Sequence, residues 1–120
     1  MNERELVERY DQAWNDHDVE AIVAMHAPDV VFQNHTAGER AEGDSVRHHI
    51  EEIFRNWPDL SFRSRRLYVC EGLVVSEWTA TGTKDGRTLE WDGVDVFPIE
   101  DGLIQRKDVY SGFGAARALD

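Results

Sequence analysis

Helix-forming patterns fill the first half of this chain and strand-forming patterns fill the second, and this order constrains the fold most strongly. Apolar residues recur at helical spacing over residues 3–15, 18–27 and 44–57, with Asp18 and Asp44 placed to cap the second and third helices. A run of helices followed by a run of strands is typical of an α+β domain rather than a parallel α/β sheet. We therefore predict three helices packed on an antiparallel sheet.

The strands are predicted from short β-rich segments separated by turn residues. Lys84-Asp85-Gly86 and Glu100-Asp101-Gly102 are typical of hairpin turns, because Asp-Gly tolerates positive φ. A long antiparallel sheet must bury one face, and a curved sheet wrapped on helices leaves a cavity at its open end. One short strand is predicted in the first half, over 30–34, followed by a polar loop over 35–43; the others are predicted over 62–70, 73–83, 88–99 and 103–110.

Length and charge limit the domain count and the class of partner. The chain has 120 residues, which predicts a single domain over residues 1–120. Its 24 acidic and 13 basic residues give a net charge of -11, which argues against nucleic acid and anionic membranes as partners. No apolar run approaches the roughly eighteen residues of a membrane span, and no signal-peptide pattern opens the chain. We expect a cytoplasmic protein.

Asp95 is the first candidate site residue. Strand alternation places Trp91, Asp95 and Phe97 on one face of the segment 91–97. A carboxylate among aromatic rings is costly to ionise, so its pKa should rise, and the protonated acid can donate a hydrogen bond to an oxyanion. The alternative is an aspartate at a strand edge that is solvated or paired with an arginine.

Tyr10 and Asp108 are the other candidate catalytic residues. Tyr10 lies on the apolar face of the first predicted helix, where its hydroxyl is either a donor into the cavity or bonded to a core carbonyl. Asp108 is predicted on the same strand face as Ile104, Arg106 and Tyr110. It is either a general acid or base or the partner of Arg106 in an ion pair.

Motifs for metals and cofactors are missing from the sequence. The histidines have no HxxxH or HxH spacing, and His26 is predicted on the apolar face of the second helix as a core or lid residue. The single cysteine, Cys70, is interpreted as a core residue and excludes a disulfide framework. No nucleotide-binding glycine motif occurs. We expect neither a metal nor a cofactor.

Two stretches resemble the nuclear-transport-factor-two-like superfamily. The first runs from Arg9-Tyr10 through Trp14-Asn15-Asp16-His17-Asp18 to Val30, and the second runs from Gly93-Val94-Asp95-Val96-Phe97 to Tyr110. The superfamily includes ketosteroid isomerases, SnoaL-like polyketide cyclases, limonene epoxide hydrolases and scytalone dehydratases. The resemblance implies one SnoaL-like domain with the cystatin-like α+β barrel fold: a cone-shaped, curved antiparallel sheet on three helices, usually a homodimer.

The resemblance to ketosteroid isomerases is partial at the site. Tyr10 and Asp95 fall where that family has the tyrosine and protonated aspartate that hold the dienolate oxygen. The position of its base holds Asn34, which cannot accept a proton at neutral pH. The SnoaL-like cyclases use an acidic residue on the last strand, for which Asp108 is the nearest candidate. The Arg-x-Asp motif of the epoxide hydrolases is absent, since the corresponding strand reads Glu77-Trp78-Thr79.

Two functions remain open at this stage. The first is a cofactor-free isomerase, cyclase or dehydratase that acts on a small apolar carbonyl compound, with Tyr10, Asp95 and Asp108 as catalytic residues. Its proton could instead be moved by His35 or, less favourably, by Glu77. The second function is a non-catalytic ligand-binding or dimerisation module. The pocket in either case is expected to contain Trp14, Asn34, His35, Glu77 and Tyr110.

A homodimer through the outer face of the sheet is also expected. Val74 and Trp78 lie on one face of their predicted strand and Val75 lies on the other. Since helices cover only one side of the sheet, apolar residues on the second side need another covering surface.

Overall fold

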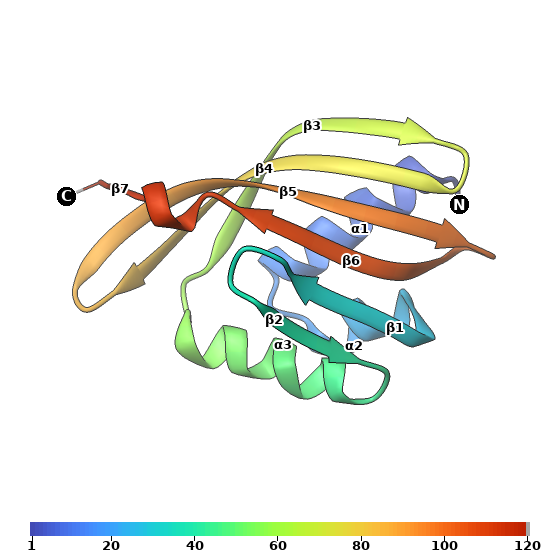
Figure 1. Cartoon of the computed structure of the whole chain (residues 1–120), viewed down its shortest axis with the longest axis horizontal. Coiled ribbons are helices and arrows are strands. Elements are labelled where there is room, and N and C mark those ends of the chain that lie inside the picture. The colour runs from blue at the N-terminus through green and yellow to red at the C-terminus, as the bar shows by residue number, and fades with distance from the viewer. Residues whose placement is uncertain (120) are drawn as a thin grey trace.

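A computed structural model describes residues 1–119 and shows three helices packed on one seven-stranded sheet. The strand order is β2-β1-β6-β5-β4-β3, and β7 pairs with β5. Figure 1 shows the sheet with α1 behind it and α3 beside β2 at the lower edge. The elements are α1 (Glu3–Asn15), α2 (Val19–Ala24), β1 (His26–Asn34), β2 (Glu39–Glu42), α3 (Ser45–Asn56), β3 (Ser61–Cys70), β4 (Leu73–Lys84), β5 (Arg87–Glu100), β6 (Leu103–Ser111), the short 3-10 helix η1 (Phe113–Ala115) and β7 (Arg117–Ala118).

The three predicted helices are confirmed. Side-chain caps explain where α1 and α2 begin. The Asn2 side chain accepts a hydrogen bond from the backbone of Glu5 at the start of α1, and Asp18 accepts one from Ala21 at the start of α2. Asp44 precedes α3 as predicted, but its side chain makes no capping bond. The first helix buries an apolar stripe against the sheet: Leu6, Val7, Tyr10, Ala13 and Trp14.

The chain enters the sheet earlier than predicted. The prediction that His26 lies on the second helix is wrong, because α2 ends at Ala24 and β1 begins at His26. Backbone pairing with the last long strand explains the difference: Ile104 donates to the carbonyl of Met25, and His26 is the parallel partner of Ile104. The sheet is therefore mixed, with β1 and β6 parallel and its other strand pairs antiparallel.

The predicted loop over 35–43 is wrong in part, because it contains β2. The Asn34 side chain accepts hydrogen bonds from the backbone of Thr36 and Ala37, and this turn returns the chain along β1. Its sequence, Glu-Arg-Ala-Glu, shows no apolar alternation, since β2 is an exposed edge strand that buries little. Charged residues on such an edge disfavour pairing with another chain.

An irregularity in β6 reverses which of its side chains face the helices. Val96 of β5 pairs with Asp108, whereas Ile99 pairs with Ile104, so the register changes by one residue between these pairs. Ile104 and Lys107 are buried, whereas Asp108 is only partly buried and Tyr110 is exposed. The prediction that Asp108 shares a face with Ile104 is therefore wrong, since a one-residue shift moves all later side chains to the other face.

The described residues contain no helix that is both long and apolar enough to span a membrane.

Candidate functional site

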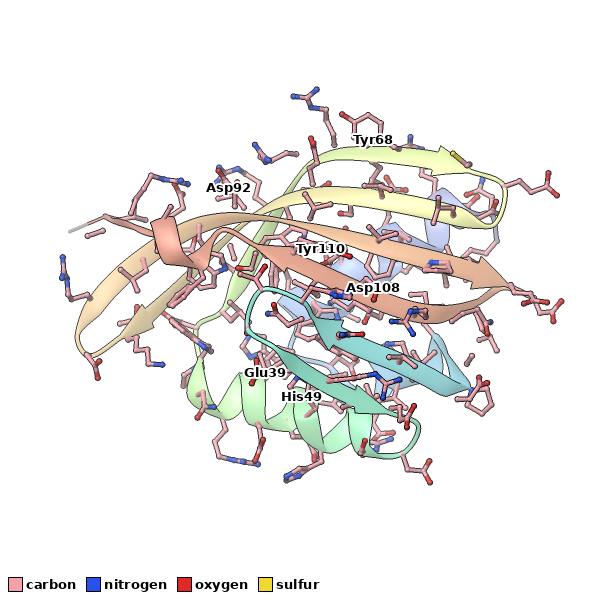
Figure 2. The ribbon with its side chains drawn as sticks, viewed as in Figure 1. Glu39, His49, Tyr68, Asp92, Asp108 and Tyr110 are labelled. Carbon is pink, nitrogen blue, oxygen red and sulfur yellow. The ribbon has the colours of Figure 1, made fainter. Side chains whose placement is uncertain are left out.

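A cavity of about 590 Å³ lies between the sheet and α3. All four tryptophans of the chain line it, together with three phenylalanines. Glu39 of β2 and His49 of α3 also line it, and Figure 2 labels both in the region of the lower helix. The aromatic residues of this lining are Trp14, Phe32, Trp57, Phe62, Trp78, Trp91 and Phe113. A space of this size and composition suits a small, largely apolar molecule.

A second cavity, of about 190 Å³, meets the first at a common boundary. Its other side is polar, with Glu8, Asp11, Gln12, Asn15 and Ser64. Five residues line both cavities and are called here the shared wall: Trp14, Phe62, Trp78, Asp95 and Lys107. A ligand in the larger cavity can therefore reach one carboxyl group and one amine that also border a polar cavity.

Asp95 and Lys107 form a buried charged pair on neighbouring strands. Asp95 is 6% exposed and Lys107 is 5% exposed, and Lys107 Nζ lies 3.9 Å from Asp95 Oδ2. Burial raises the pKa of Asp95, and the nearby ammonium group partly offsets this increase. Burial lowers the pKa of Lys107, and Asp95 and Asp11 counteract that decrease. Both shifts favour the neutral forms, the carboxyl group of Asp95 and the amine of Lys107, over what exposed side chains of these types would show.

Asp11 extends this charged group into the smaller cavity. Burial raises the pKa of Asp11 to about 7; Asp95 adds to the increase and Lys107 opposes it. Two carboxyl groups and one amine therefore interact where the two cavities meet.

Several polar atoms at the shared wall have no protein partner. Asp95 Oδ1 and the indole nitrogens of Trp14 and Trp78 are buried and make no hydrogen bond to the described residues. An unsatisfied buried polar group costs about 1–3 kcal/mol. A ligand that supplies complementary donors and acceptors to these atoms would remove part of this cost.

Tyr10 lies behind the shared wall rather than on a cavity surface. Its side chain is fully buried, and its hydroxyl shares a 2.9 Å hydrogen bond with Nε2 of His26. Burial raises the pKa of Tyr10 well above its usual value and lowers the pKa of His26 to about 4. Neither residue lines the two cavities. Of the two alternatives predicted for Tyr10, the geometry corresponds to the core residue rather than to a donor into the cavity. Its hydrogen-bond partner is a histidine side chain, not the predicted backbone carbonyl.

Asp108 lies on the other face of the sheet and lines neither cavity. The guanidinium of Arg106 donates to both of its carboxylate oxygens, at 2.8 and 3.1 Å, and His35 donates to it at 2.8 Å. These hydrogen bonds, that from Arg106 foremost, lower the pKa of Asp108. Figure 2 shows Asp108 and Tyr110 on the side of the sheet that faces away from α1. Of the two alternatives predicted for Asp108, the geometry corresponds to the ion pair with Arg106 rather than to a general acid or base in the pocket.

The remaining predicted pocket residues divide between the two faces. Trp14 and Asn34 line the larger cavity as expected. His35 stacks on Tyr110 with ring centroids 4.6 Å apart, and Glu77 forms an ion pair with Arg66 at 3.2 Å. The three predicted pocket residues His35, Glu77 and Tyr110 therefore line neither cavity. The sequence reasoning missed Lys107, Asp11 and His49. Lys107 gave one signal: it is a lysine inside a strand whose neighbours, Arg106 and Asp108, could pair with each other.

The comparisons with known proteins agree with this architecture. The model of the SnoaL-like domain family matches residues 7–107. The chain belongs to the SnoaL-like domain family. No curated protein matched this SnoaL-like domain.

Solved structures with the same fold are similar at low sequence identity. The epoxide hydrolase/cyclase-like enzyme SalBIII, which takes part in pyran ring formation in the polyether salinomycin, is 20% identical with a TM-score of 0.85, over 96% of this chain and 94% of its own. A candidate SnoaL-like polyketide cyclase from a Jannaschia species is 19% identical with a TM-score of 0.82, and the match covers 92% of this chain and 85% of the cyclase. A candidate ketosteroid isomerase from Kribbella flavida is 22% identical with a TM-score of 0.73, and the match covers 90% of this chain and 76% of the isomerase. At these identities the likeness establishes the cystatin-like α+β fold.

Proposed function

We propose that this SnoaL-like domain is a cofactor-free enzyme that moves protons on a small, largely apolar carbonyl compound, as an isomerase, cyclase or dehydratase. One observation carries the proposal. Asp95 Oδ1 is buried without a hydrogen-bond partner, at the wall of an aromatic cavity and beside the amine of Lys107. A carboxyl group that lines a cavity and has a shifted pKa is typical of a catalytic acid or base.

The two charged residues would have complementary tasks. The carboxylate of Asp95 would take a proton from the carbon next to the carbonyl group, since a raised pKa makes a carboxylate a stronger base. The ammonium group of Lys107 would stabilise the enolate oxygen that forms, in a cavity where low polarity strengthens the interaction. Return of the proton from Asp95 to a second atom of the same molecule completes an isomerisation. The same two steps could serve a cyclisation or an elimination.

The location of the other candidates supports Asp95 as the group that moves the proton. Asp108 lines neither cavity and is held by Arg106 and His35. Tyr10 is hydrogen-bonded to His26 behind the wall. The names of the structural neighbours, which include a cyclase and an isomerase, agree with this reaction class without establishing it for this chain.

Hydrogen–deuterium exchange of a ring ketone tests the proposal. The protein in D2O is mixed with 2-tetralone, a bicyclic ketone with exchangeable protons beside its carbonyl group, and loss of these proton signals is followed by NMR. We expect exchange faster than in buffer, and Asp95→Asn should slow it by about a hundredfold or more, the usual scale for a general base. Asp108→Asn is the matched control on the opposite face and should leave the rate unchanged.

Ligand binding is measured in the same samples, because all four tryptophans line the cavity. Their indole N–H signals should shift when the ketone enters. If these signals shift while exchange stays at the buffer rate, the domain is a binding module and the enzyme proposal is wrong. An equal loss of exchange in both variants would also contradict the role given to Asp95.

A further inference from the structure

The amine of Lys107 is a second reactive group at the shared wall. Its side chain is 7% exposed, yet Nζ makes no hydrogen bond to any described residue. Its nearest charged neighbour, Asp95, is 3.9 Å away, which is longer than the 2.7–2.9 Å of a charge-assisted hydrogen bond. The amine therefore borders the aromatic cavity without being held by a protein acceptor.

Four aromatic rings surround this amine. Nζ lies 3.8 Å from the ring centroid of Trp14, 4.9 Å from that of Tyr10, 5.1 Å from that of Phe32 and 6.0 Å from that of Phe97. Ring faces stabilise a cation at these distances. They would stabilise a protonated imine at the same position, since that group carries the same charge.

We propose that Lys107 is a covalent carbonyl-binding site that forms an imine with an aldehyde or ketone in the larger cavity. A buried lysine in an apolar pocket is the usual setting for this chemistry, because burial favours the neutral, nucleophilic amine. The inference goes beyond the proton transfer proposed above and does not require it.

The reaction needs only the carbonyl compound, Lys107 and the proton held by Asp95. The amine nitrogen bonds to the carbonyl carbon, and one N–H proton moves to the carbonyl oxygen, which gives a carbinolamine. The C–O bond then breaks, and the hydroxyl group leaves as water with the proton from the Asp95 carboxyl group. The nitrogen lone pair forms the C=N bond, so a protonated imine remains beside the Asp95 carboxylate.

Charge at the wall favours a neutral carbonyl compound over an anionic one. Asp11 faces the amine from the smaller cavity and repels a carboxylate or phosphate group when it is ionised. The Asp95 carboxylate left after the imine forms adds to this repulsion. The aromatic lining favours an aldehyde or ketone attached to a ring.

Reductive trapping with benzaldehyde and cyanoborohydride tests the proposal on the unmodified protein. Cyanoborohydride delivers hydride to a protonated imine and fixes the benzyl group on nitrogen. The chain contains two lysines, Lys84 and Lys107. Lys84 also lines the larger cavity, with its amine 5.2 Å from the Trp57 ring centroid, but it is exposed, so it is an internal reference for an amine that is not buried. Each unit by which the pKa of an amine falls raises its neutral fraction about tenfold near neutral pH. We expect Lys107 to be benzylated faster than Lys84, as measured by peptide mass mapping at pH 7.

Labelling should rise with pH while the amine loses its proton, because the neutral amine is the reactive form, and fall again at higher pH, because cyanoborohydride reduces only the protonated imine. The groups that face the amine and also titrate are Asp95 on β5, Asp11 and Tyr10 on α1 and His26 on β1. The rise should come at lower pH for Lys107 than for Lys84, because burial lowers the pKa of Lys107.

Two variants provide the controls. Lys107→Arg should remove the fast labelling, and Lys84→Arg should keep it. Faster labelling of Lys84 than of Lys107 in the unmodified protein would overturn the proposal, even if Lys107→Arg does not fold. Because this readout is independent of ketone exchange, either proposal can fail while the other stands.

Discussion

Replacing Asp11 by asparagine should stabilise the protein near pH 8 and change its stability little near pH 4. Burial, with help from Asp95, raises the pKa of Asp11 from 3.8 to about 7. Between these values the folded state keeps a proton that the unfolded state has lost. The free energy of unfolding of the natural chain therefore falls as pH rises from 4 to 7, and the loss is complete above pH 7. Asparagine does not titrate, so the variant avoids this loss.

The size of the effect follows from the pKa shift and from the exposure of the site. A shift of about three units corresponds to at most about 4 kcal/mol, at about 1.4 kcal/mol per unit. Asp11 is only partly buried and borders a cavity, so solvent screening reduces this ceiling. The variant also loses the attraction between Asp11 and Lys107. We expect a net gain of about 1–2 kcal/mol near pH 8.

Urea denaturation followed by circular dichroism at the two pH values measures this gain. Glu5→Gln is the control on the same helix: Glu5 is exposed in the first turn, where a negative charge is favourable. This control should lose a few tenths of a kcal/mol near pH 8, which is the opposite sign. Equal changes for Asp11→Asn at both pH values, or a loss near pH 8, would refute the reasoning.

Three further predictions follow from the packing. Tyr10→Phe removes the hydrogen bond to His26 and should cost about 1–3 kcal/mol in urea denaturation while leaving ketone exchange unchanged; a large loss of exchange would return Tyr10 to the mechanism. Gly93→Ala should cost about 1–3 kcal/mol and shift the indole signal of Trp78, because a Cβ at Gly93 would lie 2.2 Å from that ring; an unchanged signal would contradict this. We also propose a homodimer through the outer face of β3 to β6, where Tyr110 is 48% exposed; sedimentation should show a dimer at micromolar concentration, which Tyr110→Glu weakens, and a monomer for the natural chain would contradict it.

The fold was predictable where local chemistry decides it. Asp18 caps the start of its helix, and the Asp85-Gly86 and Asp101-Gly102 turns have positive φ, as their residue types favour. Long-range pairing was not predictable in the same way. The parallel alignment of β1 with β6 joins residues 75 or more positions apart, such as Val31 and Arg106, and β2 has no apolar pattern because it lies exposed at an edge. Neither feature leaves a periodic signal in the sequence.

The candidate site depends on one register change that periodicity cannot show. Asp95 was placed on the cavity side because β5 alternates regularly from Trp91 to Phe97. In β6 the shift between Ile104 and Asp108 interrupts the alternation, so Lys107 faces the cavities. Without this shift, Asp108 would be buried on the face that already holds Asp95, and Lys107 would lie outside.

Electrostatics favours the observed register. Two buried carboxylates on neighbouring strands repel, whereas a carboxylate and an amine attract and partly offset the cost of burying both. On the outer face, Arg106 and His35 satisfy the carboxylate of Asp108 at lower cost, because these groups stay partly in water. The shift in β6 therefore exchanges a carboxylate for an amine at the shared wall. This exchange is why the chemistry proposed here rests on an acid and a lysine rather than on two acids.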